Sequence, residues 1–153
     1  MIDLIADSNF ILGLIDKKDK WNPISIQLRD ALKDTGCTVI YFDCVITEVC
    51  SALGKRLEEK GRGQEFADLL SRLGELVPDE KITWIYPEIK SYFSEAKNLM
   101  RKYFGKLSFH DALIAMAAKE MGVEHIVSFD KDFDEIEWLI RIKDMSELKF
   151  ESR

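Results

Sequence analysis

The chain has 153 residues, 46% of them hydrophobic and 33% charged, a composition that predicts one folded domain spanning residues 1–153. Its net charge of −6 argues against a broadly basic nucleic-acid binder, but it is compatible with an enzyme that meets nucleic acid through a metal ion. No apolar stretch reaches the roughly 18 residues that cross a bilayer, and the N-terminus lacks the basic segment of a secretory signal. Three cysteines without C-x-x-C spacing favour reduced thiols, so we expect a cytoplasmic protein with no membrane partner.

Short apolar, β-branched runs alternate with helical patterns along the chain. Strands are predicted at 2–6, 37–43, 81–87, 124–129 and 137–144, and helices at 8–15, 23–36, from about 45–48 onward, 63–78, 89–104 and 109–121. This alternation predicts a three-layer α/β/α sandwich with a mainly parallel central sheet of about five strands. Ligand sites in such folds lie at the carboxyl edge of the strands.

Four acidic residues are predicted to meet at that edge. Asp7 follows the first strand, Asp130 follows the strand at 124–129, and Glu48 lies in the first turn of the helix after the second strand. Asp111 begins a helix of about 13 residues, which at 1.5 Å per residue carries the chain back across the sheet before the strand that leads to Asp130. We therefore expect Asp111 at the same edge.

Each acid also has an ordinary structural explanation. Asp7 could cap the following helix, and Glu48 could interact with the dipole of its own helix. Asp111 could complete a capping box with Ser108, and Asp130 could be a turn residue. Four carboxylates on one edge repel, however, by roughly 3 kcal/mol for a pair about 5 Å apart at an effective dielectric near 20. A divalent cation would offset this repulsion, and all-oxygen ligands favour Mg²⁺ or Mn²⁺.

The acidic stretch VSFDKDFDEIE at 127–137 is not expected to be a calcium loop. In an EF-hand that starts at Asp130, the sixth position would be Glu135 instead of glycine, and the twelfth would be Arg141 instead of glutamate. We expect Asp130 to belong to the metal cluster and Asp132 to support it. The remaining acids of the stretch, Asp134, Glu135 and Glu137, are predicted to be solvated beyond a core anchor, Phe133.

Four stretches together resemble the PIN-domain ribonuclease family, which includes VapC-type toxins. They are IADSNFILGL (5–14), VITEVCSAL (45–53), LSFHDALIAMAAKEMGV (107–123) and IVSFDKDFDEI (126–136). Their order and approximate spacing match the family over nearly the whole chain. One departure is Ser128, where the family usually has threonine, and the segment 55–80 is less typical of the family.

The resemblance implies a Mg²⁺- or Mn²⁺-dependent endoribonuclease that hydrolyses RNA phosphodiester bonds. Its catalytic carboxylates would be Asp7, Glu48, Asp111 and Asp130, of which Asp7, Asp111 and Asp130 would ligate the metal. Residues that would orient carboxylates or contact phosphate are Ser8, Asn9, Ser128 and Asp132. Direct roles are not expected for His110 or His125, and Trp21, Phe10 and Phe109 are expected in the core or at an interface.

The resemblance also implies partners: an RNA substrate, a small antitoxin protein and a second copy in a homodimer. The basic segment from Lys55 to Arg62 could hold RNA backbone beside the site. The alternatives are a catalytically silent PIN-like module that binds RNA or acts as a scaffold, and a PIN nuclease of RNA processing instead of a toxin. A nucleotide-binding or phosphotransfer domain is disfavoured because no G-x-G-x-x-G or G-x-x-x-x-G-K-[ST] motif is present.

Overall fold

The computed structural model describes residues 2–148 and contains a five-stranded sheet in which all neighbouring strands are parallel. The strands lie in the order β3-β2-β1-β4-β5, so β1 is central. Their bounds are β1 Asp3–Ala6, β2 Thr38–Phe42, β3 Ile82–Thr83, β4 His125–Val127 and β5 Ile140–Ile142. The predicted α/β fold with about five mainly parallel strands is confirmed.

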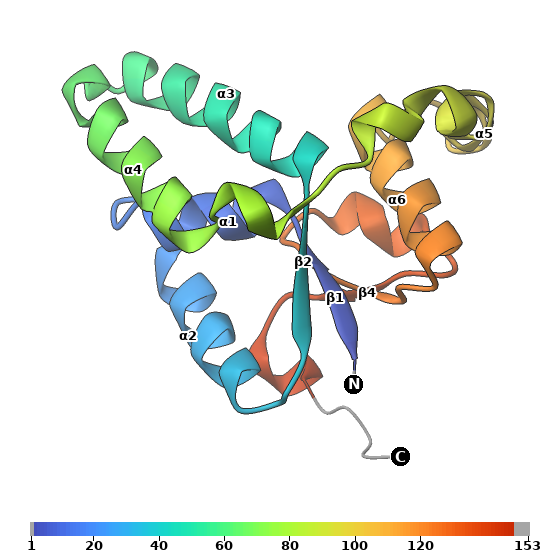
Figure 1. The fold of residues 1–153 in the computed structure, drawn as a ribbon, viewed down its shortest axis with the longest axis horizontal. Helices are drawn as coiled ribbons and strands as arrows, with labels where there is room; N and C mark the ends of the chain where they lie inside the picture. Colours follow the sequence, from blue (N-terminus) through green and yellow to red (C-terminus); the bar gives the residue numbers. More distant parts are fainter. Residues whose placement is uncertain (1, 149–153) are drawn as a thin grey trace.

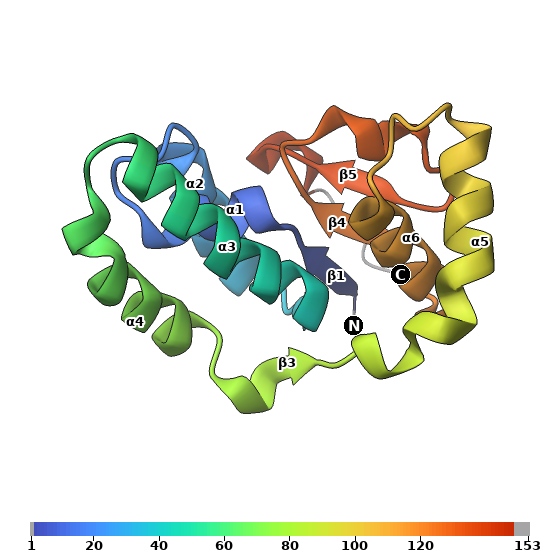
Figure 2. The ribbon, with the colours of Figure 1, turned by 90° about the horizontal axis from the view of Figure 1, so that it is seen from above.

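Helices lie on both sides of this sheet. Within residues 2–148 the α-helices are α1 Ser8–Ile15, α2 Asn22–Lys33, α3 Asp43–Glu59, α4 Phe66–Leu76, α5 Ile89–Lys102 and α6 Phe109–Met121. Short 3₁₀ segments are η1 Gly63–Glu65, η2 Asp79–Lys81, η3 Tyr86–Glu88, η4 Lys131–Glu135 and η5 Met145–Glu147. Helices α1 and α2 lie on one side of the sheet, and α5 and α6 lie on the other (Figures 1 and 2).

The central strand shows why this sheet is buried. Leu4, Ile5 and Ala6 of β1 are each 0% exposed, because both faces of the strand are covered. Small side chains along α6 let it approach the sheet closely; Ala112, Ala115, Ala117 and Ala118 are all fully buried. Within residues 2–148, no helix has both the length and the hydrophobicity needed to span a membrane.

Two predicted element bounds are corrected. Helix α3 begins at Asp43, directly after the extended Phe42, and not at 45–48, so Glu48 lies in its second turn. The strand predicted at 81–87 is limited to Ile82–Thr83, because the chain turns into η3 at Tyr86.

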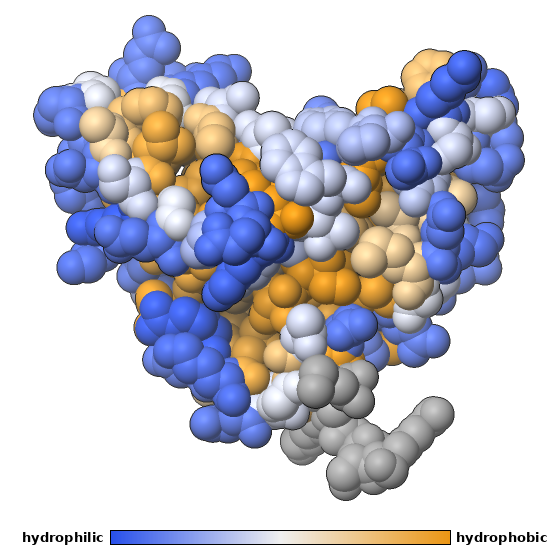
Figure 3. Space-filling model, viewed as in Figure 1, coloured by the Kyte–Doolittle hydropathy of each residue, from blue (hydrophilic) through white to orange (hydrophobic). Residues whose placement is uncertain are grey.

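Two helical arms rise above the carboxyl edge of the sheet. One arm consists of α3 and α4, and the other of α5 and α6 (Figure 1). The chain that joins α4 to α5, which includes β3 and η3, runs between the arms along one side (Figures 1 and 2). In the space-filling view the surface is notched between the two arms (Figure 3).

Candidate metal centre

Asp7 lies at the carboxyl end of the central strand and is only 4% exposed. It is the N-cap of α1, and its Oδ1 accepts a hydrogen bond of 2.8 Å from the Ser8 amide. Its Oδ2 accepts a 2.6 Å hydrogen bond from the hydroxyl of Ser128. The capping explanation is therefore correct, but it accounts for one oxygen only, because the other is held by a residue from the neighbouring strand.

The residues that follow β4 form a hydrogen-bonded turn beside Asp7. Ser128 is 0% exposed, and its Oγ accepts a 3.0 Å hydrogen bond from the Asp130 amide while its hydroxyl donates to Asp7. Asn9 accepts from the Phe129 amide at 3.1 Å, and its Nδ2 lies 3.5 Å from the Ser128 Oγ. Ser128 and Asn9 thus fix the turn that leads to Asp130, whose charge acts on Asp111.

Asp111 and Glu48 approach from the two helical arms. Asp111 forms the predicted capping box with Ser108: the Ser108 Oγ accepts from the Asp111 amide at 3.1 Å, and the Asp111 Oδ2 accepts from the Ser108 amide at 3.4 Å. Glu48 is exposed on α3. The ordinary explanation of Asp111 is therefore correct as well, and it holds the carboxylate at the sheet edge where the strand–helix order predicts it.

The charges of neighbouring carboxylates contribute to a raised pKa at two of the four acids, Asp7 and Asp111. Burial raises the pKa of Asp7 to about 7, against the hydrogen bonds from Ser128 and Ser8, and the charges of Asp111 and Glu48 add to the rise. Burial likewise raises the pKa of Asp111 to about 6, with further contributions from the charges of Asp130 and Glu48. Like charges are therefore gathered at this edge, as the order of elements predicts.

The donor chemistry of this cluster fits a hard divalent cation. Carboxylate and hydroxyl oxygens are the ligands that Mg²⁺ and Mn²⁺ prefer. Among the described residues, however, no three His, Cys, Asp or Glu side chains are arranged so that they could hold an ion as they stand. Asp7, Glu48, Asp111 and Asp130 therefore form an open set of like charges at this edge.

The other predicted residues take different places. The Asp132 Oδ1 lies 4.0 Å from the Nζ of Lys106, and the Asp132 amide donates a 2.9 Å hydrogen bond to Asp130. Ser8 contacts Asp7 through its backbone amide. Phe133 is fully buried, which confirms the predicted core anchor.

The outer acids of the stretch are solvent-accessible, as expected, with side chains 56%, 40% and 80% exposed for Asp134, Glu135 and Glu137, and each also lies near a cation. Asp134 lies 2.7 Å from Arg141, Glu135 lies 2.7 Å from Lys106, and Glu137 lies 3.7 Å from Lys102. These pairs join η4 and the residues after it to β5 and to the end of the α5–α6 arm.

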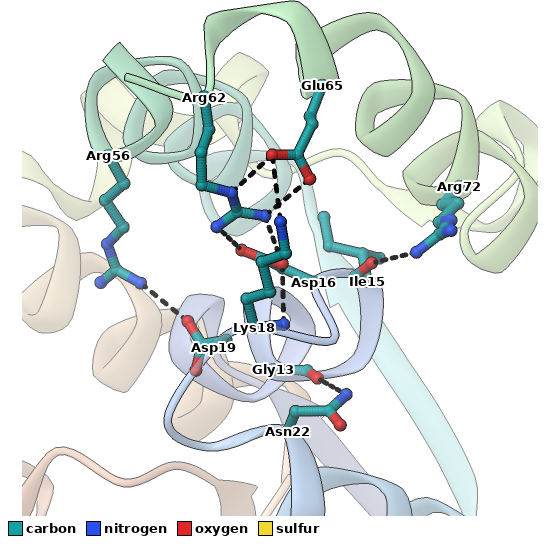
Figure 4. Close-up of polar contacts among 10 residues, drawn as sticks. All are labelled: Gly13, Ile15, Asp16, Lys18, Asp19, Asn22, Arg56, Arg62, Glu65 and Arg72. Atoms are coloured by element: carbon teal, nitrogen blue, oxygen red, sulfur yellow. Dashed lines mark hydrogen bonds and ion pairs between the residues drawn. The ribbon is translucent and has the colours of Figure 1, made fainter. Parts of the chain in front are cut away.

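Much of the basic segment after Glu48 is already engaged. Arg62 binds Asp16 at 2.9 Å and Glu65 at 2.6 Å, and Arg56 lies 3.3 Å from Asp19 (Figure 4). These contacts hold the loop between α1 and α2 against the α3–α4 arm. The two arginines therefore have a structural role, which the run of charges in the sequence did not indicate.

Sequence reasoning also missed a polar cluster beside the acids. Asp43, which is 1% exposed, accepts hydrogen bonds of 2.8 Å from the amides of Cys44 and Tyr86. The Tyr86 hydroxyl lies 2.7 Å from the Thr47 Oγ1 and 3.5 Å from the His110 Nε2. Thr47 and His110 directly precede Glu48 and Asp111, and this adjacency was the one signal that the sequence offered.

Comparisons with known proteins identify the family and the fold of this chain. The PIN domain family matches residues 4–139. Similar solved structures include the toxin VapC20 of Mycobacterium tuberculosis, which cleaves the sarcin–ricin loop (TM-score 0.65, 14% identity, 89% of this chain and 96% of that chain). Another is VapBC2 of Rickettsia felis bound to a DNA fragment from its promoter (TM-score 0.66, 15% identity, 92% of this chain and 98% of that chain).

A third similar structure is PAE2754 of Pyrobaculum aerophilum (TM-score 0.54, 18% identity, 92% of this chain and 89% of that chain). No curated protein sequence matches this chain significantly. The structural likenesses establish a shared fold, and the family match covers most of the sequence, including the acids at positions 7, 48, 111 and 130. The chain therefore belongs to the PIN-domain family.

Proposed function

We propose that this chain is a single PIN-like domain that hydrolyses RNA phosphodiester bonds with Mg²⁺ or Mn²⁺. The observation that carries the proposal is the gathering of Asp7, Glu48, Asp111 and Asp130 at one sheet edge, where burial and mutual repulsion raise the pKa values of Asp7 and Asp111. The repulsion within such a cluster destabilises the metal-free protein, and a bound cation would offset that cost. A purely structural role would more simply be filled by neutral caps.

In this proposal Asp7, Asp111 and Asp130 hold the ion, and Glu48 completes the cluster. The bound ion would lower the pKa of a water molecule and offset negative charge on the phosphate. The hydroxyl of Ser128 keeps one Asp7 oxygen oriented through their 2.6 Å hydrogen bond. Burial of Asp7 places its charge in a low-dielectric setting, which strengthens its interaction with a cation.

We further propose that the protein is the toxin of a toxin–antitoxin pair. The likeness to VapC20 and to VapBC2 supports this role and supports a small antitoxin as partner. An antitoxin tail that blocks the acidic cluster would prevent RNA and metal from entering. We also propose that the toxin acts as a cytoplasmic homodimer. A neighbouring gene for a small antitoxin would separate this role from RNA processing.

The test is cleavage of a structured RNA by the purified protein with and without Mn²⁺. Asp7→Asn and Asp111→Asn should each reduce the rate at least about 100-fold, because each removes a metal ligand. Asp30→Asn is the matched control, since it removes one carboxylate that is 56% exposed and pairs with Arg29 on α2. Its rate should equal that of the wild type.

Cleavage that persists in EDTA, or that survives Asp7→Asn, would contradict the metal-dependent mechanism. A wild type that binds RNA but never cleaves it with Mn²⁺ or Mg²⁺ would instead support the catalytically silent alternative.

A further inference from the structure

The Tyr86 hydroxyl contacts one residue of each helical arm. It is 2.7 Å from the Oγ1 of Thr47 on α3 and 3.5 Å from the Nε2 of His110 on α6. Tyr86 itself belongs to η3, in the chain that runs between the arms (Figure 2). One side chain therefore contacts residues next to Glu48 and Asp111, the acids contributed by the two arms.

The donor and the acceptor in each of these hydrogen bonds follow from the Cys44 carbonyl oxygen at the end of the series. The Thr47 hydroxyl lies 3.1 Å from the carbonyl oxygen of Cys44, which can only accept, so Thr47 donates its single hydrogen there. Tyr86 then donates to Thr47, and the remaining contact requires His110 to donate from Nε2 to the Tyr86 oxygen. The series runs in one direction, from His110 through Tyr86 and Thr47 to Cys44.

A buried carboxylate holds the start of η3 in place. Asp43 is 1% exposed, and its Oδ2 accepts a 2.8 Å hydrogen bond from the Tyr86 amide while its Oδ1 accepts from the Cys44 amide at 2.8 Å. A buried carboxylate is costly unless it is hydrogen-bonded, and here both oxygens accept from backbone amides. Tyr86 is thus attached to the first turn of α3 by its backbone and by its side chain.

From this geometry we infer that Tyr86 is a positioning residue, whose hydroxyl sets the separation between Glu48 on α3 and Asp111 on α6. Four repelling carboxylates push the arms apart when no cation is bound, and the Tyr86 bridge resists that force. The inference rests on the metal-dependent function proposed above. It assigns to Tyr86 no contact with the reacting phosphate.

The test measures Mn²⁺ affinity by calorimetry without RNA, so that it does not depend on catalysis. Tyr86→Phe keeps the ring and removes the hydroxyl, and it should weaken Mn²⁺ binding about tenfold, as does the loss of other residues that support metal ligands. Thr47→Val removes the partner hydroxyl from an exposed position and should have a similar effect. Tyr103→Phe is the matched control, because it removes a hydroxyl at the end of α5 and should leave the affinity unchanged.

The double variant Thr47→Val/Tyr86→Phe tests whether the two hydroxyls act together. Its Mn²⁺ affinity should be no lower than that of the weaker-binding single variant, since both changes break the same series of hydrogen bonds. Losses that multiply would show independent effects and overturn the inference. Wild-type affinity in Tyr86→Phe would overturn it while leaving the proposed function intact. Failure of the wild type to bind Mn²⁺ would overturn both.

Discussion

Two charged regions of the molecule differ in kind: the corner where Arg62 meets Asp16 and Glu65, and the sheet edge that holds Asp7 and Asp111. At the corner the charges are opposite (Figure 4). Burial raises the pKa of Asp16, but the hydrogen bonds and charge of Arg62 outweigh it, so the pKa falls below its usual value. At the sheet edge, burial and like charges raise the pKa values of both acids.

The opposite charges at the corner stabilise the fold, whereas the like charges at the sheet edge are held there for another purpose. Arg62 and its two carboxylates satisfy one another and join the α1–α2 loop to the α3–α4 arm. In contrast, the described side chains around Asp7 provide hydrogen bonds but no neutralising arginine or lysine partner. An added cation should therefore change the second region and leave the first as it is.

The largest expected effect is stabilisation by metal. Mn²⁺ at about 100 times its dissociation constant should raise the melting temperature of the wild type by about 5–10 °C, since binding to the folded state contributes about 2.7 kcal/mol. Asp7→Asn should abolish this rise, whereas Arg56→Ala, which alters only the corner, should keep it. Scanning calorimetry at fixed pH measures both. An equal rise in Asp7→Asn would place the cation elsewhere.

Breaking the corner should cost stability at neutral pH. Arg62→Ala leaves Asp16, whose side chain is 11% exposed, without its cation, and should lower the free energy of unfolding by about 2 kcal/mol. Urea titration measures the change. Arg56→Ala, whose side chain is 47% exposed, should cost less than about 1 kcal/mol. Equal losses of unfolding free energy in the two variants would show that the partly buried Arg62–Asp16 pair stabilises the fold no more than the exposed Arg56–Asp19 pair.

Neutralising Asp7 at the sheet edge should instead raise the free energy of unfolding of the metal-free protein. The folded-state pKa of Asp7 is about 7 against an ordinary value of 3.8, so the folded protein holds a proton that the unfolded chain releases. That stabilising contribution is complete below pH 3.8 and is lost as the pH rises to about 7. Metal-free Asp7→Asn should thus be more stable than the wild type by about 1–2 kcal/mol at pH 8, with little difference near pH 4.

Denaturant titrations at the two pH values test this sign. Lower stability of Asp7→Asn at pH 8 would mean that its hydrogen bonds to Ser8 and Ser128 outweigh the relief of repulsion.

The smallest effect is expected at Asp130. Asp130→Asn keeps an oxygen that can accept from the Asp132 amide and removes one charge from the cluster, so metal-free stability should rise by about 0.5 kcal/mol. Chemical denaturation with EDTA present measures it. A clear decrease would favour the ordinary turn explanation for this residue.

Sequence periodicity predicted the sheet, the helices and the edge at which the acids meet. It worked because a parallel sheet brings the residues that follow its strands to that edge: Asp7 comes directly after β1, and Asp130 comes three residues after the end of β4. The capping box at Asp111 was predicted for the same reason, since its residues are adjacent in sequence. What these elements share is that local spacing determines where the residues lie.

The polar contacts between distant segments could not be predicted in this way. Arg62 and Asp16, or Tyr86 and Asp43, meet only because loops and arms pack against each other. No periodicity indicates such pairings, so the sequence did not show that two arginines of the basic segment bind acids within the fold. The start of α3 was missed for a related reason. Asp43 follows a β-branched run and was included in the predicted strand at 37–43. In the structure its carboxylate instead accepts a hydrogen bond from the Cys44 amide in the first turn of α3.

The central position of β1 also governs when the acidic cluster can form during synthesis. β1 pairs with β2, which comes soon after it, and with β4, which comes more than one hundred residues later, as the 121-residue separation of Ser128 from Asp7 illustrates. A nascent chain that ends before β4 can pair its first two strands but lacks the hydroxyl that holds Asp7 and lacks Asp130. The first two strands can therefore pair on the ribosome, whereas the assembled cluster appears only after β4 and Asp130 have been synthesised.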